Sequence, residues 1–335
     1  MRNLNIVCQL TPIFLAAVFA CNTAIAKPNA KPNAAARARA SSPLPDTVRK
    51  ALKAAAFPAN ALGIYVQEVD GKRALLKNQE TQAFLPASTI KLVTTDAALN
   101  LLGPSYTWKT QVLGQGKQIG ETWHGDVIVK GAFDPKLVQE NLWLLLRQLR
   151  AKGIRQINGN IVLDRSIMPI GEQDAGKFDG DPVKAYNVVP DPLLLNFKTV
   201  RLYFRPDGKN NVQVTLDPVL PQMTIAPLRA QDGRCDDWHE QLGIEFVDKR
   251  INFTGTYPAN CGEKTWDVHP YSLSPDAYFA AVLSGIWREL GGSISGTISS
   301  TISATNSAAA STESSSQPTL LVEWQSPSLA EVVRD

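Results

Sequence analysis

Short segments of alternating polar and apolar residues, each ended by turn-forming residues, fill the middle of the chain from residue 105 to residue 271. Gly, Pro, Asp and Asn separate the segments, and these residues favour turns because they supply left-handed or fixed backbone conformations. Alternation with a period of two places one face of a strand in a core and the other in water. The candidate strands are "TWKTQVLG", "GDVIVKG", "GNIVLD", "VRLYFRP", "NVQVTLDP" and "INFTGTYP". We therefore expect one or two β-rich domains over residues 105–271, with one amphipathic helix at "QENLWLLLRQLRAKGI".

Helical patterns flank this region on both sides. Before it, "DTVRKALKAAAF" spaces apolar residues four apart, as one face of a helix requires. "GIYVQEV", the turn dipeptide Asp70-Gly71 and "KRALLKN" then form the pattern of a β-hairpin. After the β-rich region, "SPDAYFAAVLSGIWRELGG" predicts a helix that Ser274 caps and Gly291-Gly292 ends.

The last part of the chain changes composition. Residues 293–318 are rich in Ser, Thr and Ala and have too little apolar surface to pack, so we expect a low-complexity, flexible loop there. "TLLVEWQS" then predicts a strand, and "SPSLAEVVRD" predicts a helix with Ser326 as its cap and Pro327 in its first turn.

The composition is that of a globular protein. Of the 335 residues, 44% are hydrophobic and 19% are charged, which excludes a coiled coil or a disordered chain. Lys and Arg outnumber Asp and Glu by 34 to 31, and several of the basic residues lie in the short segment 27–39. The rest of the chain is nearly neutral, so we expect no nucleic-acid partner.

The N-terminus has the pattern of an export signal. Arg2 gives the positive start, "IVCQLTPIFLAAVFAC" the apolar stretch, and Ala24-Ile25-Ala26 the small-x-small cleavage site. We expect a signal peptide over residues 1–26, a mature chain from Lys27 and a flexible linker over residues 27–45. A transmembrane anchor and a lipid anchor through Cys21 are the alternatives.

Cysteine usage fits an exported protein. Cleavage removes Cys8 and Cys21, which leaves Cys235 and Cys261 as a candidate disulfide. The alternative is two unrelated buried thiols. The three histidines are scattered without partners at ligand spacing, so we expect no metal site.

A serine and a lysine three residues apart begin the helical run "LPASTIKLVTTDAALNLL". Residues at this spacing share one helix face, so Ser88 and Lys91 can touch. The positive end of the helix dipole favours a developing alkoxide on Ser88, and a desolvated Lys91 can accept its proton. Ser88 is then the nucleophile and Lys91 the general base. The alternative is an ordinary helix-start serine beside a surface lysine.

We also expect apolar residues such as Ile90, Leu92 and Leu101 to bury this helix.

In its motifs, the chain resembles the D-alanyl-D-alanine carboxypeptidase/endopeptidase family, the low-molecular-mass class C penicillin-binding proteins. "PASTIKL" resembles the first active-site motif, and "IVKGAFDPKL" resembles a strand with a Gly-Gly-Asp-Pro turn, with Ala132-Phe133 in place of glycines. "AYNVVPDPLLLNFKTVRLYFRP" resembles the Tyr and Leu-x-x-Asn pattern, here Tyr186, Leu193 and Asn196. The two late cysteines fall where the family often has a pair, and "SPSLAEVVRD" resembles the segment before the second motif.

The resemblance implies an α/β (α+β) fold, with helices on an antiparallel sheet as in serine β-lactamases and transpeptidases. The catalytic domain comprises residues 46–104 and 272–335, and the β-rich region 105–271 is inserted between them. The implied protein is a periplasmic hydrolase that cuts D-Ala-containing peptidoglycan stem peptides through an acyl-enzyme on Ser88, with no metal or organic cofactor. β-Lactams are its covalent inhibitors, and peripheral membrane or cell-wall contact is a further implied interaction.

Two motifs of that family, Ser-x-Asn and Lys-Thr-Gly, are missing from residues 1–335. "FKTV" at Lys198 and "EKTW" at Lys264 lack the glycine, and "SATN" at 303–306 has the wrong spacing. The missing motifs predict an incomplete, truncated catalytic domain. Because losing one oxyanion donor already costs about a hundredfold in rate, we expect little activity from residues 1–335 alone. The alternatives are an inactive remnant or cell-wall-binding module of the family, and an unrelated exported β-rich protein in which Ser88 only caps a helix.

Overall fold

The computed structural model describes residues 44–168, 174–300 and 317–335. The chain divides into two compact units, Met1–Val93 (unit 1) and Thr94–Asp335 (unit 2). The predicted signal peptide and most of the predicted linker lie outside the described residues. Among the described helices, none is long and apolar enough to cross a membrane.

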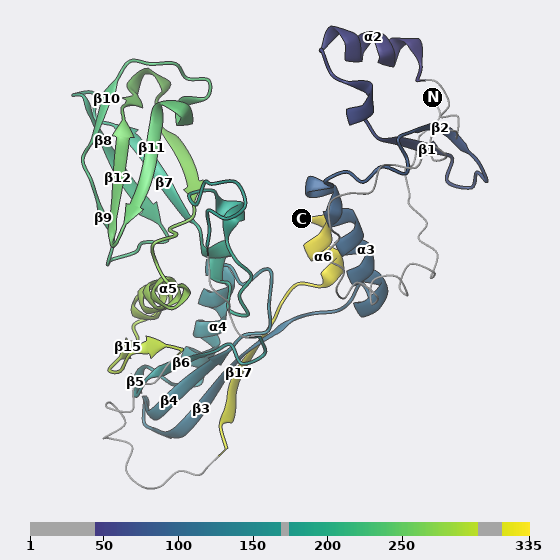
Figure 1. Cartoon of the computed structure of the whole chain (residues 1–335). Coiled ribbons are helices and arrows are strands. Elements are labelled where there is room, and N and C mark those ends of the chain that lie inside the picture. The colour runs from purple at the N-terminus through teal and green to yellow at the C-terminus, as the bar shows by residue number, and fades with distance from the viewer. Residues whose placement is uncertain (1–43, 169–173, 301–316) are drawn as a thin grey trace, which may run out of the picture. The chain divides into compact units, whose positions relative to one another are not determined.

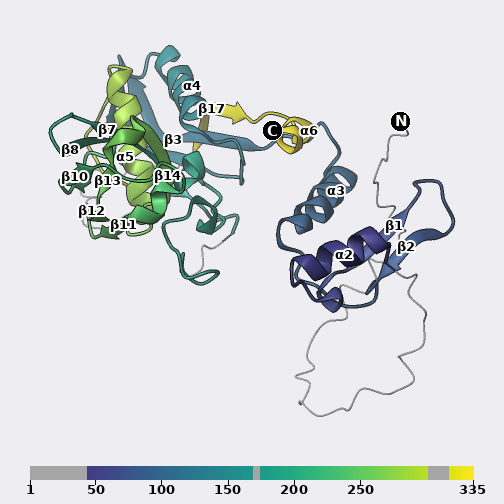
Figure 2. The ribbon, with the colours of Figure 1, turned by 90° about the horizontal axis from the view of Figure 1, so that it is seen from above.

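Unit 1 contains a helix, a hairpin and the start of a second helix (Figure 2). Helix α2 (Asp46–Ala54) and the short turn η3 (Ala59–Ala61) precede the antiparallel strands β1 (Ile64–Gln67) and β2 (Ala74–Asn78). The turn η4 (Ala87–Thr89) leads into helix α3 (Ile90–Leu102), in which the boundary between the units falls. The predicted helix and hairpin are therefore confirmed.

A seven-stranded sheet forms the base of unit 2 (Figure 1). Its main path runs β15 (Ser293–Ile294), β5 (Gln156–Asn158), β4 (Thr122–Lys130), β3 (Lys109–Ile119) and β17 (Thr319–Gln325), with β6 (Ile161–Asp164) pairing β4 and β16 (Ile298–Ser299). Strands β3 and β4 form a hairpin that turns at Gly120, where φ is +59°. Strand β17 pairs with β3 although the two are far apart in sequence.

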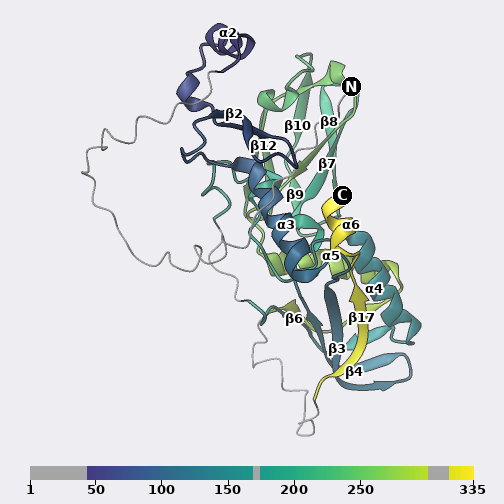
Figure 3. The ribbon, with the colours of Figure 1, turned by 90° about the vertical axis from the view of Figure 1, so that its right-hand side faces the viewer.

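Two helices contact this sheet and each other, α4 (Gln139–Ala151) and α5 (Pro275–Glu289) (Figures 1 and 3). The buried side of α4 consists of four leucines at spacings of three and four: Leu142, Leu145, Leu146 and Leu149. Each fully buried leucine contributes about 1.5–3 kcal/mol, so this stripe fixes the helix on the sheet. At the end of α4, Arg150 Nε donates to the carbonyl of Leu290, 2.9 Å away, which ties α4 to α5.

A second group of strands continues unit 2. Its five-stranded sheet has the order β13 (Tyr257–Pro258), β10 (Leu228–Gln231), β8 (Asn211–Asp217), β7 (Val200–Pro206) and β14 (Lys264–Val268). A three-stranded sheet has the order β11 (Leu242–Val247), β12 (Arg250–Gly255) and β9 (Thr224–Ile225). Aromatic rings join the two sheets, because Phe204 of β7 stacks on Tyr257 and lies edge-on to Phe253 of β12. The expected β-rich character of this region is confirmed.

Four short 3-10 helices and a last α-helix are the remaining described elements of unit 2. They are η5 (Ala185–Asn187), η6 (Leu195–Lys198), η7 (Trp238–Gln241), η8 (Ala259–Cys261) and α6 (Leu329–Arg334). Elements on both sides of residue 272 share one sheet and one hydrophobic core, as α5 and β17 show. The predicted domain boundaries remain predictions.

The predicted cap of the last helix was wrong. Helix α6 is capped by Ser328, whose Oγ accepts the Glu331 N–H while the Glu331 carboxylate accepts the Ser328 N–H, a capping box. Ser326 instead lies in the core, where its Oγ accepts from the Trp108 N–H at 2.9 Å and its own N–H donates to the Trp108 carbonyl. Ser326, which precedes Pro327, therefore makes a tertiary contact instead of capping the helix.

The flexible loop predicted over residues 293–318 was wrong for its first part. Strands β15 and β16 pair in parallel with β5 and β6. Asn160 supports this segment because its Oδ1 accepts from the Thr297 N–H at 3.0 Å. Ile294 and Ile298 also pack against the core, so hydrogen bonds and these two apolar side chains together stabilise the segment. The rest of the predicted loop, residues 301–316, lies outside the described ranges.

Candidate active site

Ser88 and Lys91 lie where a short turn becomes a long helix. Pro86 precedes the turn η4, the Thr89 N–H donates to the Pro86 carbonyl at 3.0 Å, and the Ile90 N–H points at the Ala87 and Ser88 carbonyls. Ser88 is therefore inside the first turn rather than at its cap, which weighs against a serine that only caps. Lys91 follows three residues later as the second residue of α3, so both belong to one helical face.

The residue before the serine has an unusual backbone. Ala87 has φ of +44°, in the left-handed region that residues with a Cβ rarely adopt. Strained backbone of this kind concentrates at functional sites, where it directs a neighbouring side chain. The strain next to Ser88 is thus an independent structural reason to consider this serine functional.

The expected burial of α3 was wrong. Within the described part of the chain no residue of α3 is buried, and Leu92 and Leu101 are 72% and 75% exposed. Ser88 and Lys91 are exposed as well. Apolar periodicity predicted a buried face, but burial also needs a packing partner, which periodicity does not reveal.

The two late cysteines form the predicted disulfide. Cys235, after β10, bonds to Cys261 in η8 across a sequence separation of 26. Asn260 supports the same corner, since its side chain bonds to both the N–H and the carbonyl of Gly233. The disulfide is part of the framework of the β-rich region and lies on different elements from Ser88.

The other motif residues have local structural roles. Asp134 is buried and its Oδ1 accepts the Lys136 N–H at 2.8 Å, as expected for a turn. Burial raises the pKa of the Asp134 carboxyl, although that hydrogen bond opposes the shift. Tyr186 is 64% exposed and its hydroxyl donates to Asp179 at 2.6 Å.

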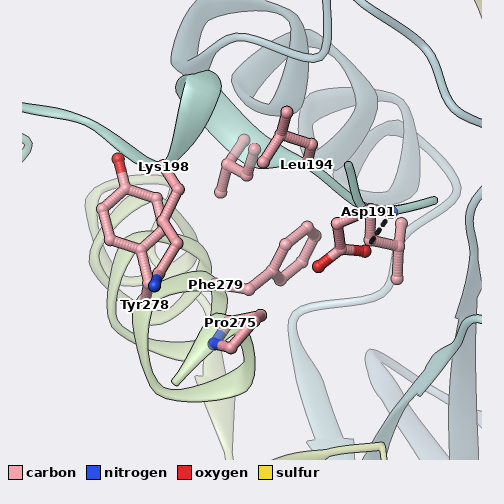
Figure 4. Close-up of a pocket in the computed structure, with 8 residues that line it drawn as sticks. Asp191, Leu194, Lys198, Pro275, Tyr278 and Phe279 are labelled. Atoms are coloured by element: carbon pink, nitrogen blue, oxygen red, sulfur yellow. Dashed lines mark hydrogen bonds between the residues drawn. The ribbon is translucent and has the colours of Figure 1, made fainter. Parts of the chain in front are cut away.

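A polar cluster in unit 2 was not predicted, and two of its members, Asp191 and Lys198, line the small cavity of Figure 4. Arg165 donates from Nε to Asp191 at 2.8 Å and from Nη1 to Asp276 at 2.6 Å. Lys198, 4% exposed, lies beside a cavity of about 10 Å³, room for about one water. No local sequence signal reveals such a cluster, because its members come from separate segments.

Burial changes the titration of two groups in this region. It lowers the pKa of Lys198 to about 8, with the nearby Asp191 charge opposing the shift. Burial and then the Lys198 charge lower the pKa of His269 to about 4. A cavity of one-water size leaves no room for a substrate beside Lys198. Lys264 lies on β14, and residues 303–306 fall outside the described ranges.

A family model and several known proteins match most of the described chain. The model of the D-Ala-D-Ala carboxypeptidase 3 (S13) family matches residues 44–333. The D-alanyl-D-alanine carboxypeptidase DacB of Haemophilus influenzae is 24% identical over 239 residues, which are 69% of this chain and 48% of the relative. The penicillin-sensitive carboxypeptidase A of Dictyostelium discoideum is 24% identical over 234 residues, 64% of this chain and 44% of the relative.

Solved structures share the fold. Penicillin binding protein 4 (dacB) from Haemophilus influenzae superposes with a TM-score of 0.64 and 22% identity over 81% of this chain and 57% of that protein. The same protein in complex with a β-lactam gives a TM-score of 0.58. The mixed α/β fold is thereby that of penicillin binding protein 4. The chain spans about half the length of the relatives it matches over most of its own length.

Proposed function

The chain belongs to the D-Ala-D-Ala carboxypeptidase 3 (S13) family, and from this membership we propose that it is a serine-type D-Ala-D-Ala carboxypeptidase or endopeptidase of peptidoglycan. The observation that carries the proposal is the Ser-x-x-Lys pair at the start of α3, within the matched residues 44–333. The strained Ala87 immediately before the serine supports it. No cofactor has a part in this proposal.

The proposed chemistry uses the two side chains in sequence. Lys91, neutral when it acts, takes the hydroxyl proton of Ser88 as the Ser88 oxygen attacks the carbonyl between two D-alanines. The proton passes on to the leaving amine of the terminal D-alanine, and an acyl-enzyme remains on Ser88. Water then releases the shortened peptide. A β-lactam acylates the same oxygen when its ring opens, which blocks the serine.

The proposed reaction has two further requirements. A lysine acts as a general base only in its neutral form, which shielding from water favours. Donors to the substrate carboxylate and the oxyanion must also be present, and the Ser-x-Asn and Lys-Thr-Gly motifs that provide them are absent from residues 1–335. Turnover therefore depends on more than the Ser88–Lys91 pair.

Location and partners follow from the same proposal. The N-terminal export pattern supports delivery to the periplasm, with cleavage near Ala26. There the stem peptides of peptidoglycan are the substrates, and contact with the cell wall or the membrane surface is a secondary interaction. N-terminal sequencing of the protein from a periplasmic extract tests the cleavage, and an uncleaved chain in the membrane fraction would contradict it.

Covalent labelling tests the nucleophile. The purified mature chain is incubated with benzylpenicillin and its intact mass is measured, with Ser88→Ala treated in parallel. If Ser88 is activated within residues 27–335, one penicillin adds to the natural chain and none to the variant. No adduct on a chain whose circular dichroism shows it to be folded would contradict an active site in residues 1–335 and leave the non-catalytic alternative.

A further inference from the structure

A groove of about 380 Å³ lies between helices α4 and α5 of unit 2 and has no part in the proposed reaction. Its lining comes from the N-terminal half of α4 and the C-terminal end of α5: Gln139, Glu140, Trp143, Leu144, Ile286 and Glu289. The two helices lie together in Figure 1. A concave site of this volume can receive two or three side chains of a partner.

The apolar part of the groove is only partly used by the core, to which the buried Ile286 belongs. The buried side of α4 is complete with its four leucines, whereas Leu144 lies on another side of the helix and is 38% exposed. Trp143 is only partly buried and packs against the edge of the core. The exposed Leu144 beside Ile286 therefore offers apolar contact to a molecule from outside.

The charges of the groove point to a cationic occupant. Glu140 and Glu289 are exposed carboxylates on the two different helices, and neither has an ion-pair partner within the described residues. Asp276, on the same helix as Glu289, is paired with Arg165. Glu289 also lies in the last turn of α5, where the helix dipole disfavours negative charge. A positive group in the groove would relieve this unfavourable position.

The aromatic ring argues against a sugar as the occupant. The guanidinium of Arg147 already lies over the Trp143 ring, 5.4 Å from its centroid, so that face is not available to stack on a pyranose. Gln139 is the one neutral polar side chain of the lining. A glycan needs several neutral donors and acceptors, whereas two carboxylates beside an aliphatic floor match a lysine or arginine side chain.

We propose that the groove between α4 and α5 binds lysine or arginine side chains of an extended segment of a partner protein. The aliphatic stems lie on Leu144 and Ile286, and the charged heads pair with Glu140 and Glu289. The net charge of the chain is +3, so a basic segment gains nothing from the overall charge and must be attracted locally.

Binding of designed peptides to the mature chain tests the proposal. A biotinylated peptide Gly-Lys-Leu-Ala-Lys-Leu-Gly is immobilised, and its twin with Glu in place of Lys serves as the charge control. We expect the basic peptide alone to bind. Glu140→Gln and Glu289→Gln should each weaken binding about two- to fivefold, the range for a surface ion pair, and the double variant about tenfold.

Matched controls separate this groove from general electrostatics. Glu245→Gln removes an exposed carboxylate on β11 and should leave binding unchanged. The proposal is overturned by equal binding of the double variant, by equal binding of the acidic twin, or by no binding of the basic peptide at about 1 mM. Displacement of the basic peptide by chitotetraose would overturn it in favour of a glycan site. None of these variants touches Ser88, so failure here leaves the penicillin test unaffected.

Discussion

Three consecutive residues with side chains, Asn196, Phe197 and Lys198, adopt left-handed backbone conformations with φ of +49°, +54° and +47°. Each such residue costs roughly 1–2 kcal/mol relative to a right-handed conformation, so the turn persists only because its surroundings fix it. The surrounding contacts include the hydroxyl of Tyr278, which donates to the Thr199 carbonyl at 2.6 Å. The turn directs Lys198 into the core, where its charge is unfavourable.

Replacing Lys198 by Met should stabilise the protein at pH 7. The folded pKa of about 8 lies below the ordinary value of 10.5, so the folded state binds fewer protons than the unfolded state between these pH values. Wild-type stability therefore rises as the pH increases from about 8 to 10.5, and below pH 8 the full penalty remains, up to roughly 3 kcal/mol. Urea unfolding at pH 7 and pH 10 measures the free energy of unfolding of the wild type and of Lys198→Met. We expect the advantage of Lys198→Met to shrink at pH 10.

The control for this measurement is Lys249→Met, which removes an exposed lysine from the turn before β12. It should change the free energy of unfolding by less than about 0.5 kcal/mol at both pH values. A Lys198→Met protein less stable than wild type at pH 7 would show that the ammonium contributes a favourable contact.

The same substitution should raise the pKa of His269. Burial is the first cause of its low value of about 4, and the positive charge of Lys198 is the second. Because folding disfavours the protonated imidazole, stability falls as the pH decreases from about 6.5 to 4. In Lys198→Met the imidazole should titrate closer to the ordinary value of 6.5, as measured by NMR of its ring proton. An unchanged titration would show that Lys198 does not act on His269.

At the scale of elements, patterns that depend on neighbours in sequence were predictive. The helix at α2, the hairpin β1–β2 and the leucine side of α4 all follow from local periodicity. The short parallel strands β15 and β16 were missed because partners such as β5 and β6, more than a hundred residues earlier, stabilise them. For the same reason the burial of α3 was wrong, since periodicity shows an apolar face but not what covers it.

The disulfide between Cys235 and Cys261 should stabilise the β-rich part of unit 2. Closing a loop across a separation of 26 lowers the entropy of the unfolded chain, worth about 3.5 kcal/mol. Replacing both cysteines by serine should therefore lower the melting temperature by about 7–14 °C, with circular dichroism as the measurement. Reducing agent should shift the wild type equally and leave the double variant unchanged. A double variant that melts with the wild type would contradict a stabilising role.

At the scale of the whole molecule, the two units differ in how much they bury. The described residues of unit 1 bury one apolar side chain, Leu44, whereas the continuous core belongs to unit 2. The pairing of Ser88 with Lys91 could be predicted because it follows from helix geometry. The surroundings of Lys91 could not, because they depend on elements distant in sequence.

Hydrogen exchange should separate α3 from α5. Helix α3 has no buried residue, while α5 buries six side chains, including Phe279 and Trp287. Amides open with a free energy that depends on local packing, so those of α3 should exchange within seconds to minutes and those of α5 far more slowly. Mass spectrometry at several protein concentrations measures this. Equal protection at all concentrations would contradict the exposure of α3, and protection that grows with concentration would indicate self-association.

The pairing of β3 with β17 has a consequence for synthesis on the ribosome. The Trp108 N–H bonds to the Oγ of Ser326, across a separation of 218 residues, and β17 lies at the end of the main path of the seven-stranded sheet. At a translation rate of about 5–20 residues per second, β3 emerges about 10–45 s before its partner. During that interval one side of β3 has no partner strand, and a nascent chain in this state can pair wrongly with another. Factors that bind nascent chains are therefore expected to affect the folding yield most in the interval between the emergence of β3 and that of β17.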